Sequence, residues 1–283
     1  MKTKKVWFIT GASRGFGSEI AKEALNNGDQ VIATVRKNSD VVKQQLGNAD
    51  RLEVVVLDVT DEASIKNAVE NAVGRFGRID VLVNNAGQGL LSGVEEASDA
   101  EVRKVYDANV FGLLNVTRAV LPYFRRQRSG HIINLSSVGG LTGITGWGLY
   151  GSTKFAVEGI TEALAAELAP LGIFATAVEP GFFRTDFLDA SSLMTTPHII
   201  DDYAGTVGKM RSFAAEVNHK QPGSAVKAAR AIVRLGHAEQ PPVHLPLGRD
   251  TLAMFKEKMD KFNADIEAWR DTIVGTDHDD VKA

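Results

Sequence analysis

Thr10-Gly11-Ala12-Ser13-Arg14-Gly15-Phe16-Gly17 is the stretch of sequence that decides the fold. It follows a short apolar run at residues 6–9. After it, apolar residues recur at the spacing of a helix face: Ile20, Ala21, Ala24 and Leu25. The sequence therefore predicts a strand, a glycine-rich turn and a helix in succession.

Glycines in such a turn let the backbone approach a ligand closely, and the helix that follows offers unpaired N–H groups and the positive end of its dipole. This combination favours binding of a pyrophosphate group. The spacing is G-x-x-x-G-x-G, which differs from the G-x-G-x-x-G of the commonest dinucleotide fingerprint. A plain strand-to-helix connection is the alternative at this point.

The end of the second predicted strand bears on the choice of cofactor. This strand runs from Gln30 to Val35 and is followed by Arg36 and Lys37. An acidic residue about 20 positions beyond the glycine turn usually holds the ribose of NAD, whereas an arginine there accommodates the 2′-phosphate of NADP. No acid occurs at residues 34–38, and Arg14 adds a cation. NADP is therefore favoured, the alternative being that Arg36 and Lys37 are solvated loop cations.

Further predicted strands end in small or polar residues. Residues 52–57 precede Asp58 and Val59, residues 80–83 precede Asn84-Asn85-Ala86-Gly87, residues 132–137 end at Ser137, and residues 174–178 precede Pro180, Gly181 and Thr185. Ligands of parallel sheets bind at the carboxyl ends of the strands. Strands alternate with helical patterns throughout, so we expect an α/β fold with a mainly parallel sheet.

Several polar residues have expected structural roles. The amides of Asn84 and Asn85 can brace neighbouring loops, and Asp61 can serve as a helix N-cap. Asn109 falls among apolar residues in a helical stretch at 98–126, which we expect to be interrupted near Pro122. A buried asparagine must be hydrogen-bonded, since an unpaired one costs about 1–3 kcal/mol.

Tyr150 and Lys154 are four residues apart, so on a helix their side chains share one face. A neighbouring ammonium favours the phenolate, and we therefore expect it to move the pKa of Tyr150 from about 10 toward neutrality. General acid–base catalysis is most efficient there. Taken alone, such a pair is equally compatible with a solvated helix surface.

Composition excludes several classes of function. The 283 residues are 44% hydrophobic, so we expect one domain at residues 1–283. The formal charge is −3 and there is no basic stripe, so we expect no nucleic-acid partner. No apolar run approaches the roughly 18 residues of a membrane span. The absence of cysteine excludes disulfides and thiolate metal sites, and fits a cytoplasmic location. No metal site is predicted.

Taken together, these motifs resemble those of the short-chain dehydrogenase/reductase family. The resemblance covers about residues 5–185 and rests on the joint order of TGxxxGxG, NNAG, Asn109, Ser137, YxxxK and Pro180-Gly181. It implies a Rossmann-type, doubly wound sheet with helices on both faces. In the layout of its last third the chain is similar to the hydroxysteroid and retinol dehydrogenase branch.

The resemblance also implies roles for the predicted site residues. Tyr150 would protonate a substrate carbonyl oxygen to which Ser137 also hydrogen-bonds. Lys154 would lower the pKa of Tyr150 and hold ribose hydroxyls, while Asn109 would order a water that links Lys154 to solvent. The residues expected to contact NADP(H) are Gly11, Ser13, Arg14, Gly15, Phe16, Gly17, Arg36, Asp58, Val59, Asn85, Ala86, Gly87, Tyr150, Lys154, Pro180, Gly181 and Thr185.

The last third of the chain contains two further predicted segments. Residues 182–223 mix polar and apolar side chains, as a mobile substrate lid does, and their apolar share suggests an apolar substrate. An irregular surface loop is the alternative. Residues 249–275 predict a long helix whose apolar stripe encloses the substrate site or forms a contact in a homodimer or homotetramer; the alternative is that it packs on its own domain. The stripe is Leu252, Phe255, Met259, Phe262, Ile266, Trp269 and Ile273.

The sequence thus predicts an NADP(H)-dependent enzyme that interconverts a small-molecule carbonyl compound and its alcohol. Two alternatives stay open. One is an NADP-binding regulatory protein without significant turnover. The other is an acyl-thioester ketoreductase, which would require a basic patch near the lid, where only Lys209 and Arg211 are found.

Overall fold

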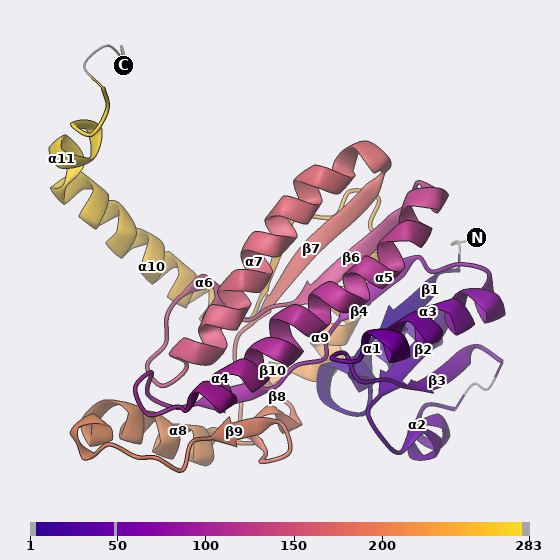
Figure 1. Cartoon of the computed structure of the whole chain (residues 1–283), viewed down its shortest axis with the longest axis horizontal. Coiled ribbons are helices and arrows are strands. Elements are labelled where there is room, and N and C mark those ends of the chain that lie inside the picture. The colour runs from indigo at the N-terminus through magenta and orange to yellow at the C-terminus, as the bar shows by residue number, and fades with distance from the viewer. Residues whose placement is uncertain (1–3, 48–49, 279–283) are drawn as a thin grey trace.

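The computed structural model describes residues 4–47 and 50–278, so both ends of the predicted 1–283 domain lie outside the described residues. A seven-stranded sheet forms its centre (Figure 1), with the strand order β11-β7-β6-β4-β1-β2-β3. The strands are β1 (Val6–Ile9), β2 (Gln30–Val35), β3 (Leu52–Val56), β4 (Val81–Asn84), β6 (Gly130–Leu135), β7 (Ile173–Pro180) and β11 (His244–Leu247). All neighbouring pairs are parallel, which confirms the predicted fold class.

The order in which successive strands are added to the sheet reverses at β1. The chain proceeds outward through β2 and β3 and then returns to place β4 on the other side of β1. Phe8 of β1 is accordingly in register with both Ile32 of β2 and Leu82 of β4. In doubly wound sheets, the crevice at the carboxyl ends of the strands next to such a reversal is where ligands bind.

Helices cover both faces of the sheet. The helices of the described residues are α1 (Gly15–Asn26), α2 (Ser39–Leu46), α3 (Glu62–Phe76), α4 (Asp99–Tyr106), α5 (Gly112–Gln127), α6 (Val138–Leu141), α7 (Gly148–Leu168), α8 (Lys209–Val217), α9 (Ala225–Gly236), α10 (Arg249–Ala268) and α11 (Arg270–Val274), and not all of them lie on the sheet. Short 3-10 and π turns join them: η1 (Asp107–Phe111), η2 (Ala169–Leu171), η3 (Asp186–Leu188), η4 (Asp201–Tyr203) and η5 (Ala204–Gly208).

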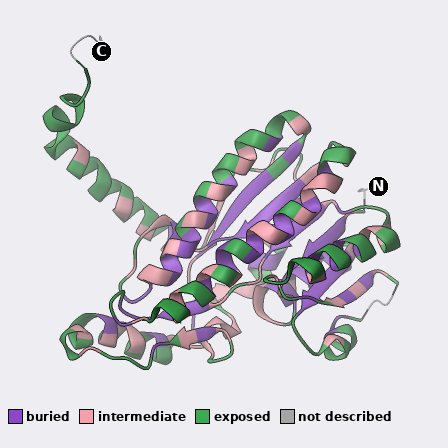
Figure 2. Ribbon diagram, in the orientation of Figure 1, coloured by how far each residue is buried: buried purple, intermediate pink, exposed green. Residues whose placement is uncertain are grey.

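The side-chain alternation of β1 divides the core into two halves. Trp7 and Ile9 point to one face, where α1, α2 and α9 pack, whereas Val6 and Phe8 point to the other, where α3, α5 and the end of α7 pack. Figure 2 shows the strands buried between helices that are exposed on their outer sides. A sheet buried on both faces explains why its strands read as continuous apolar runs.

The helical stretch around Asn109 differs from its prediction. Pro122 lies inside α5 without ending it, so the predicted interruption there is wrong. The irregularity lies instead at η1, a π-helical turn that contains Asn109. Proline removes only one N–H donor from a helix, and packing of the apolar side of α5 against the sheet holds this helix together across it.

The predicted lid segment at 182–223 is a structured excursion. A two-stranded parallel pair joins β8 (Phe183–Arg184) to β10 (Gly223–Ser224), and a second pair joins β9 (Leu193–Thr195) to β5 (Gly89–Leu91). Figure 1 shows β9 and α8 together below the carboxyl ends of the central strands. Strand pairing therefore holds this segment at both ends and at β9, unlike an irregular surface loop.

Helix α10 leaves the body of the protein and extends away from it (Figure 1). Its first half is anchored by the buried Thr251, by Asp250, whose carboxylate accepts a hydrogen bond from the Phe182 N–H at 2.6 Å, and by Lys258, which donates to the Leu141 carbonyl oxygen. Leu252, Phe262 and Trp269 are each more than half exposed. The alternative that this helix packs its apolar stripe on its own domain is therefore wrong. Within the described part of the chain, no helix has the length and apolar character needed to cross a membrane.

Candidate functional site

A cavity of about 1000 Å³ lies at the carboxyl ends of β1, β2, β4, β6 and β7. Nearly all the site residues predicted from the sequence line it. They are Gly11, Ser13, Arg14, Gly15, Phe16, Arg36, Asp58, Val59, Asn85, Ala86, Gly87, Ser137, Tyr150, Lys154, Pro180, Gly181 and Thr185. Gly17 and Asn109 do not line it. Residues from seven separate stretches of sequence thus meet around one space.

The glycine turn forms one wall of this cavity. Gly11 and Gly15 have φ angles of +67° and +56°, which side chains other than glycine rarely adopt. A Cβ atom on Gly11 would also lie 2.9 Å from the Cα of Ala86, so the two loops can approach only because Gly11 has none. Helix α1 begins at Gly15 with its N-terminus at the cavity, which leaves N–H groups available to an anion.

Gly17 contributes to packing rather than to the wall of the cavity. A Cβ atom there would strike the carbonyl oxygen of Gly11 and the amide of Asn85. The predicted bracing by asparagine is confirmed at this point: Asn85 Nδ2 donates hydrogen bonds to the carbonyl oxygens of Thr10 at 2.9 Å and Gly11 at 3.0 Å. Asn84 Nδ2 similarly donates to Asn134 Oδ1 at 2.9 Å.

Cations and polar groups line the end of the cavity beyond β2. Arg36, Lys37 and Asn38 all lie on it. Asp58 Oδ1 accepts hydrogen bonds from the backbone and hydroxyl of Thr60, and these lower the pKa of Asp58. The nearby Asp61 caps α3 through the N–H groups that follow it, as predicted.

Arg14 lies on the cavity wall, but its guanidinium group faces the 182–223 segment. Its Nη2 donates hydrogen bonds to the Ser191 carbonyl oxygen at 2.7 Å and to Ser192 Oγ at 2.8 Å. Arg14 therefore links the glycine turn directly to the chain beside β9. The sequence alone gave no sign of this contact, because the two segments are 177 residues apart.

Tyr150 and Lys154 lie on one face of α7, as their spacing predicts, and both are buried. Lys154 Nζ donates a hydrogen bond to the Leu135 carbonyl oxygen at 2.7 Å and lies 5.7 Å from the centre of the Tyr150 ring. The ring of Tyr150 contacts Trp147 and Phe187, with centroid separations of 5.8 and 5.4 Å.

The predicted pKa shift of Tyr150 is wrong for this structure. Burial raises the pKa of Tyr150 to about 12, and the hydrogen bond with Ser137 acts in the opposite direction. Burial also lowers the pKa of Lys154 to about 8, against the raising effect of Glu158. Both changes have one cause, since a nonpolar enclosure disfavours the charged form of each group.

Asn109 is held inside the protein by three hydrogen bonds. Its Oδ1 accepts from the Gln88 N–H at 2.9 Å, and its Nδ2 donates to the Gln88 carbonyl oxygen at 3.0 Å and to Thr153 Oγ1 at 3.1 Å. The expectation that a buried asparagine must be hydrogen-bonded is confirmed. Asn109 thus connects η1 to Gln88 on the cavity wall and to α7 next to Lys154.

An apolar wall closes the cavity near Tyr150. It consists of Ile144, Trp147, Phe187 and Leu188. Trp147 stacks on Phe187 with a centroid separation of 6.1 Å. Sequence reasoning did not single out Trp147 or Gln88. The signal for Trp147 was its position three residues before Tyr150, which is one helical turn, whereas nothing local marked Gln88.

Comparison with known proteins agrees with this geometry. A family model described as short chain dehydrogenase matches residues 5–195. Oxidoreductase BOA17 of Botryotinia fuckeliana is 40% identical over 273 residues, which cover 94% of this chain and 97% of that protein. A 3-ketodihydrosphingosine reductase of Bacteroides thetaiotaomicron is 38% identical, with 86% of this chain and 88% of that protein covered.

Solved structures give the same result. A short-chain dehydrogenase from Streptomyces avermitilis superposes with a TM-score of 0.90 at 38% identity, covering 98% of this chain and 100% of that one. Two neighbours hold different cofactors. ElxO with NADP bound has a TM-score of 0.74 at 30% identity over 89% of this chain and 100% of its own. A 3-ketoacyl-(acyl-carrier-protein) reductase from Brucella melitensis, complexed with NADH, has a TM-score of 0.73 at 28% identity over 87% and 98%.

The matched region contains the glycine turn, Ser137, Tyr150 and Lys154, all of which line one cavity. This chain therefore belongs to the short-chain dehydrogenase/reductase family of oxidoreductases.

Proposed function

We propose that the protein is an NADP(H)-dependent oxidoreductase that interconverts a ketone or aldehyde and the corresponding alcohol. One observation carries the proposal: Tyr150, Lys154 and Ser137 line the same cavity as the glycine turn and Arg36. A dinucleotide long enough to reach from the turn to Tyr150 would bring its reactive end to a buried proton donor.

The residues of the cavity fit such a cofactor. The glycine turn and the N-terminus of α1 would hold the pyrophosphate, and Asp58 and Val59 would flank the adenine. Asn85, Ala86 and Gly87 would lie near the adenosine ribose. Pro180, Gly181 and Thr185 would border the nicotinamide.

The preference for NADP(H) over NAD(H) rests on the end of β2. Arg36, Lys37 and Asn38 line the cavity there, and none of them is acidic. A guanidinium group binds the 2′-phosphate of NADP(H) strongly. NAD(H) has no 2′-phosphate and would gain nothing from this interaction. The NADP bound to ElxO is compatible with this assignment, which rests on the residues of this chain.

The protonation state of Tyr150 fits the role of an acid when the reaction runs in the reductive direction. The bound cofactor supplies the hydride. Tyr150 gives its proton to the carbonyl oxygen as that oxygen becomes negative, and the Ser137 hydroxyl donates a hydrogen bond to the same oxygen. With its pKa raised to about 12, Tyr150 carries a proton at neutral pH and can act as the acid.

Lys154 and Asn109 would support this step. The Lys154 ammonium would hold the ribose hydroxyls of the cofactor. Asn109, fixed by Gln88 and Thr153, would order a water molecule through which the proton of Tyr150 is restored from solvent.

The substrate is proposed to be fairly apolar. Trp147, Phe187, Leu188 and Ile144 enclose the space beside Tyr150, and they offer no charge to a polar substrate. The Bacteroides relative is named for reduction of 3-ketodihydrosphingosine, which makes a long-chain ketone a natural member of the test set.

A substrate panel tests the proposal. The purified protein is incubated with NADPH and with small and long-chain ketones, aldehydes, 3-ketodihydrosphingosine and a 3-ketoacyl thioester, and loss of NADPH absorbance is followed. We expect turnover of apolar ketones or aldehydes. Turnover of the thioester alone would favour the acyl-thioester ketoreductase, and tight NADPH binding without turnover of any compound would favour a regulatory protein.

A further inference from the structure

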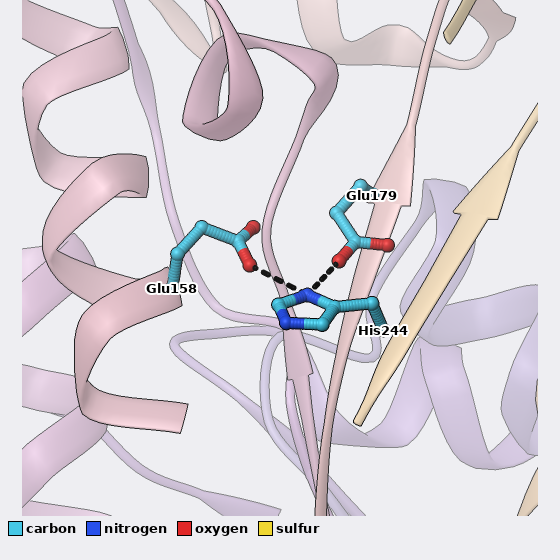
Figure 3. Close-up of side chains that lie close together, drawn as sticks. All are labelled: Glu158, Glu179 and His244. Atoms are coloured by element: carbon cyan, nitrogen blue, oxygen red, sulfur yellow. Dashed lines mark hydrogen bonds and ion pairs between the residues drawn. The ribbon is translucent and has the colours of Figure 1, made fainter. Parts of the chain in front are cut away.

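Three ionisable side chains lie together outside the cavity. Glu158 comes from α7, Glu179 from β7 and His244 from β11, and none of them lines the cavity at Tyr150. Figure 3 shows both carboxylates pointing toward the imidazole ring of His244. The chemistry proposed above uses none of these residues.

The imidazole is shared by two carboxylates. His244 Nδ1 lies 2.9 Å from Glu179 Oε1 and 3.4 Å from Glu158 Oε2. One ring nitrogen carries at most one proton, so it can donate a hydrogen bond to only one of the two carboxylates. The shorter distance indicates that His244 Nδ1 donates its hydrogen bond to Glu179.

Glu158 is consequently left without the imidazole proton. Only 6% of it is exposed, and apart from the Ser136 hydroxyl beside it, its carboxylate oxygens have no hydrogen-bond partner among the described residues. Glu179 is fully buried, and its Oε2 also lacks a partner within that part of the chain. Two buried carboxylates facing one imidazole are costly unless a cation joins them.

We propose that Glu158, Glu179 and His244 form a binding site for a divalent transition metal ion, with Zn²⁺ as the best fit. Their ligand atoms all lie within 4.8 Å of one another. Tetrahedral Zn²⁺ with bonds of about 2.0–2.2 Å separates its ligand atoms by roughly 3.4 Å. The Nδ1 to Glu158 Oε2 distance already equals this value, and the Nδ1 to Glu179 Oε1 distance must open by roughly half an ångström.

The identity of the ion follows from the ligands. An imidazole nitrogen with two carboxylate oxygens suits Zn²⁺, whereas Mg²⁺ and Ca²⁺ prefer oxygen ligands alone and more of them. Two carboxylates and a neutral imidazole also balance the charge of a divalent ion. A solvent molecule would complete the tetrahedron.

The surroundings provide an orienting partner and an entry path. His244 Nε2, the nitrogen that would not bind the metal, lies 3.5 Å from Glu162 Oε1, and a carboxylate in that position fixes the tautomer of a metal-binding histidine. The His244 side chain is 42% exposed, so the ion can reach the site from solvent. The bound metal would join α7, β7 and β11 one helical turn beyond Lys154.

Isothermal titration of the purified, chelator-treated protein with ZnCl2 tests the proposal, together with thermal unfolding in the presence and absence of ZnCl2. We expect one Zn²⁺ per chain at this site. At about a hundredfold excess over Kd, Tm should rise by roughly 5 °C, and EDTA should reverse the rise. His244→Ala and Glu158→Gln should weaken binding at least about tenfold and abolish the increase in Tm.

A second cluster supplies the matched control. Asp186, Asp189 and His219 also have potential ligand atoms within 4.8 Å of one another, but their cluster is more exposed. His219→Ala should therefore keep both the Zn²⁺ affinity and the Tm response. The proposal is overturned if the wild type does not bind ZnCl2, if His244→Ala binds it with unchanged affinity, or if binding is lost in His219→Ala and kept in His244→Ala.

Discussion

At the scale of single residues, Lys154 is a buried cation on the wall of the cavity. Its ammonium is buried against the Leu135 carbonyl oxygen and the Tyr150 ring, and burial lowers its pKa to about 8. The charged form therefore predominates below about pH 8 and is lost as the pH rises through that value. If the ammonium holds the cofactor ribose, binding must follow the same titration.

We accordingly predict that NADPH affinity, measured by isothermal titration from pH 6 to pH 10, decreases as the pH passes through about 8. Lys154→Ala should bind NADPH roughly 10–100-fold more weakly at pH 7, because hydrogen bonds to charged groups contribute about 1.5–3 kcal/mol. It should also lose the inflection near pH 8. Equal affinities of the wild type and Lys154→Ala at pH 7 would contradict the role given to Lys154.

Arg36 is the residue on which the proposed preference for NADP(H) rests. Arg36→Asp replaces a partner for the 2′-phosphate by one for a ribose hydroxyl and adds repulsion against the phosphate. We expect the ratio of kcat/KM for NADPH to that for NADH to decrease at least about tenfold. Lys43→Asp is the control, since Lys43 is an exposed cation of α2 that does not line the cavity. A wild type that already prefers NADH would refute the assignment.

At this scale, spacing in the sequence predicted where a side chain lies on its helix better than it predicted how buried that side chain is. The four-residue interval between Tyr150 and Lys154 placed both on one face of α7, as any helix would. It did not give the direction of the pKa shift of Tyr150, because that depends on burial by Trp147 and Phe187, and Phe187 is remote in sequence. The contact of Arg14 with Ser191 and Ser192 was hidden for the same reason.

Helix α10 is the element whose surroundings least match its composition. The predicted apolar stripe is present, but Leu252, Phe262 and Trp269 remain more than half exposed in a single chain. Burying four such side chains would contribute on the order of 6–12 kcal/mol before entropy is subtracted. We therefore propose that this stripe forms a contact between copies of the chain.

Truncation after Lys258 tests that contact. It removes most of the exposed stripe and keeps both Asp250, which holds the Phe182 N–H, and Lys258, which donates a hydrogen bond to the Leu141 carbonyl oxygen at 2.6 Å. We expect light scattering to give the mass of a dimer or tetramer for the full chain and a smaller particle after truncation. An unchanged number of chains per particle would show that the stripe makes no contact.

Elements formed by strong local patterns were predictable, and those formed by tertiary pairing were not. The long apolar runs of β1, β2, β3 and β7 could be read within two residues of their ends. Strand β11 was missed because it has four residues, one of them Pro246, and exists only by pairing with β7. The short pairs β5–β9 and β8–β10 likewise have no signal of their own, although they fix the 182–223 segment.

At the scale of the whole molecule, the order of motifs was more informative than any one of them. Strands alternating with helices imply a parallel sheet, and small or polar residues after each strand imply a site at one edge of it. Both inferences agree with the observed sheet and with the cavity at its carboxyl edge. What could not be predicted was how the last third of the chain covers that edge, since its contacts depend on partners more than 100 residues away, such as Glu96 and Arg211.

In the proposed function, the whole architecture would bring the buried phenol of Tyr150 to the reactive end of the cofactor. Tyr150→Phe removes the transferable proton and leaves the ring, its contacts with Trp147 and Phe187, and the rest of the cavity in place. The decisive measurement is therefore kcat of this variant on the best substrate of the panel, together with its Kd for NADPH. We predict an NADPH affinity within about twofold of the wild type and a kcat reduced by roughly 10²–10⁴-fold, the usual contribution of a general acid. A variant that binds NADPH normally and retains more than about a tenth of the wild-type kcat would contradict the proposed role of Tyr150.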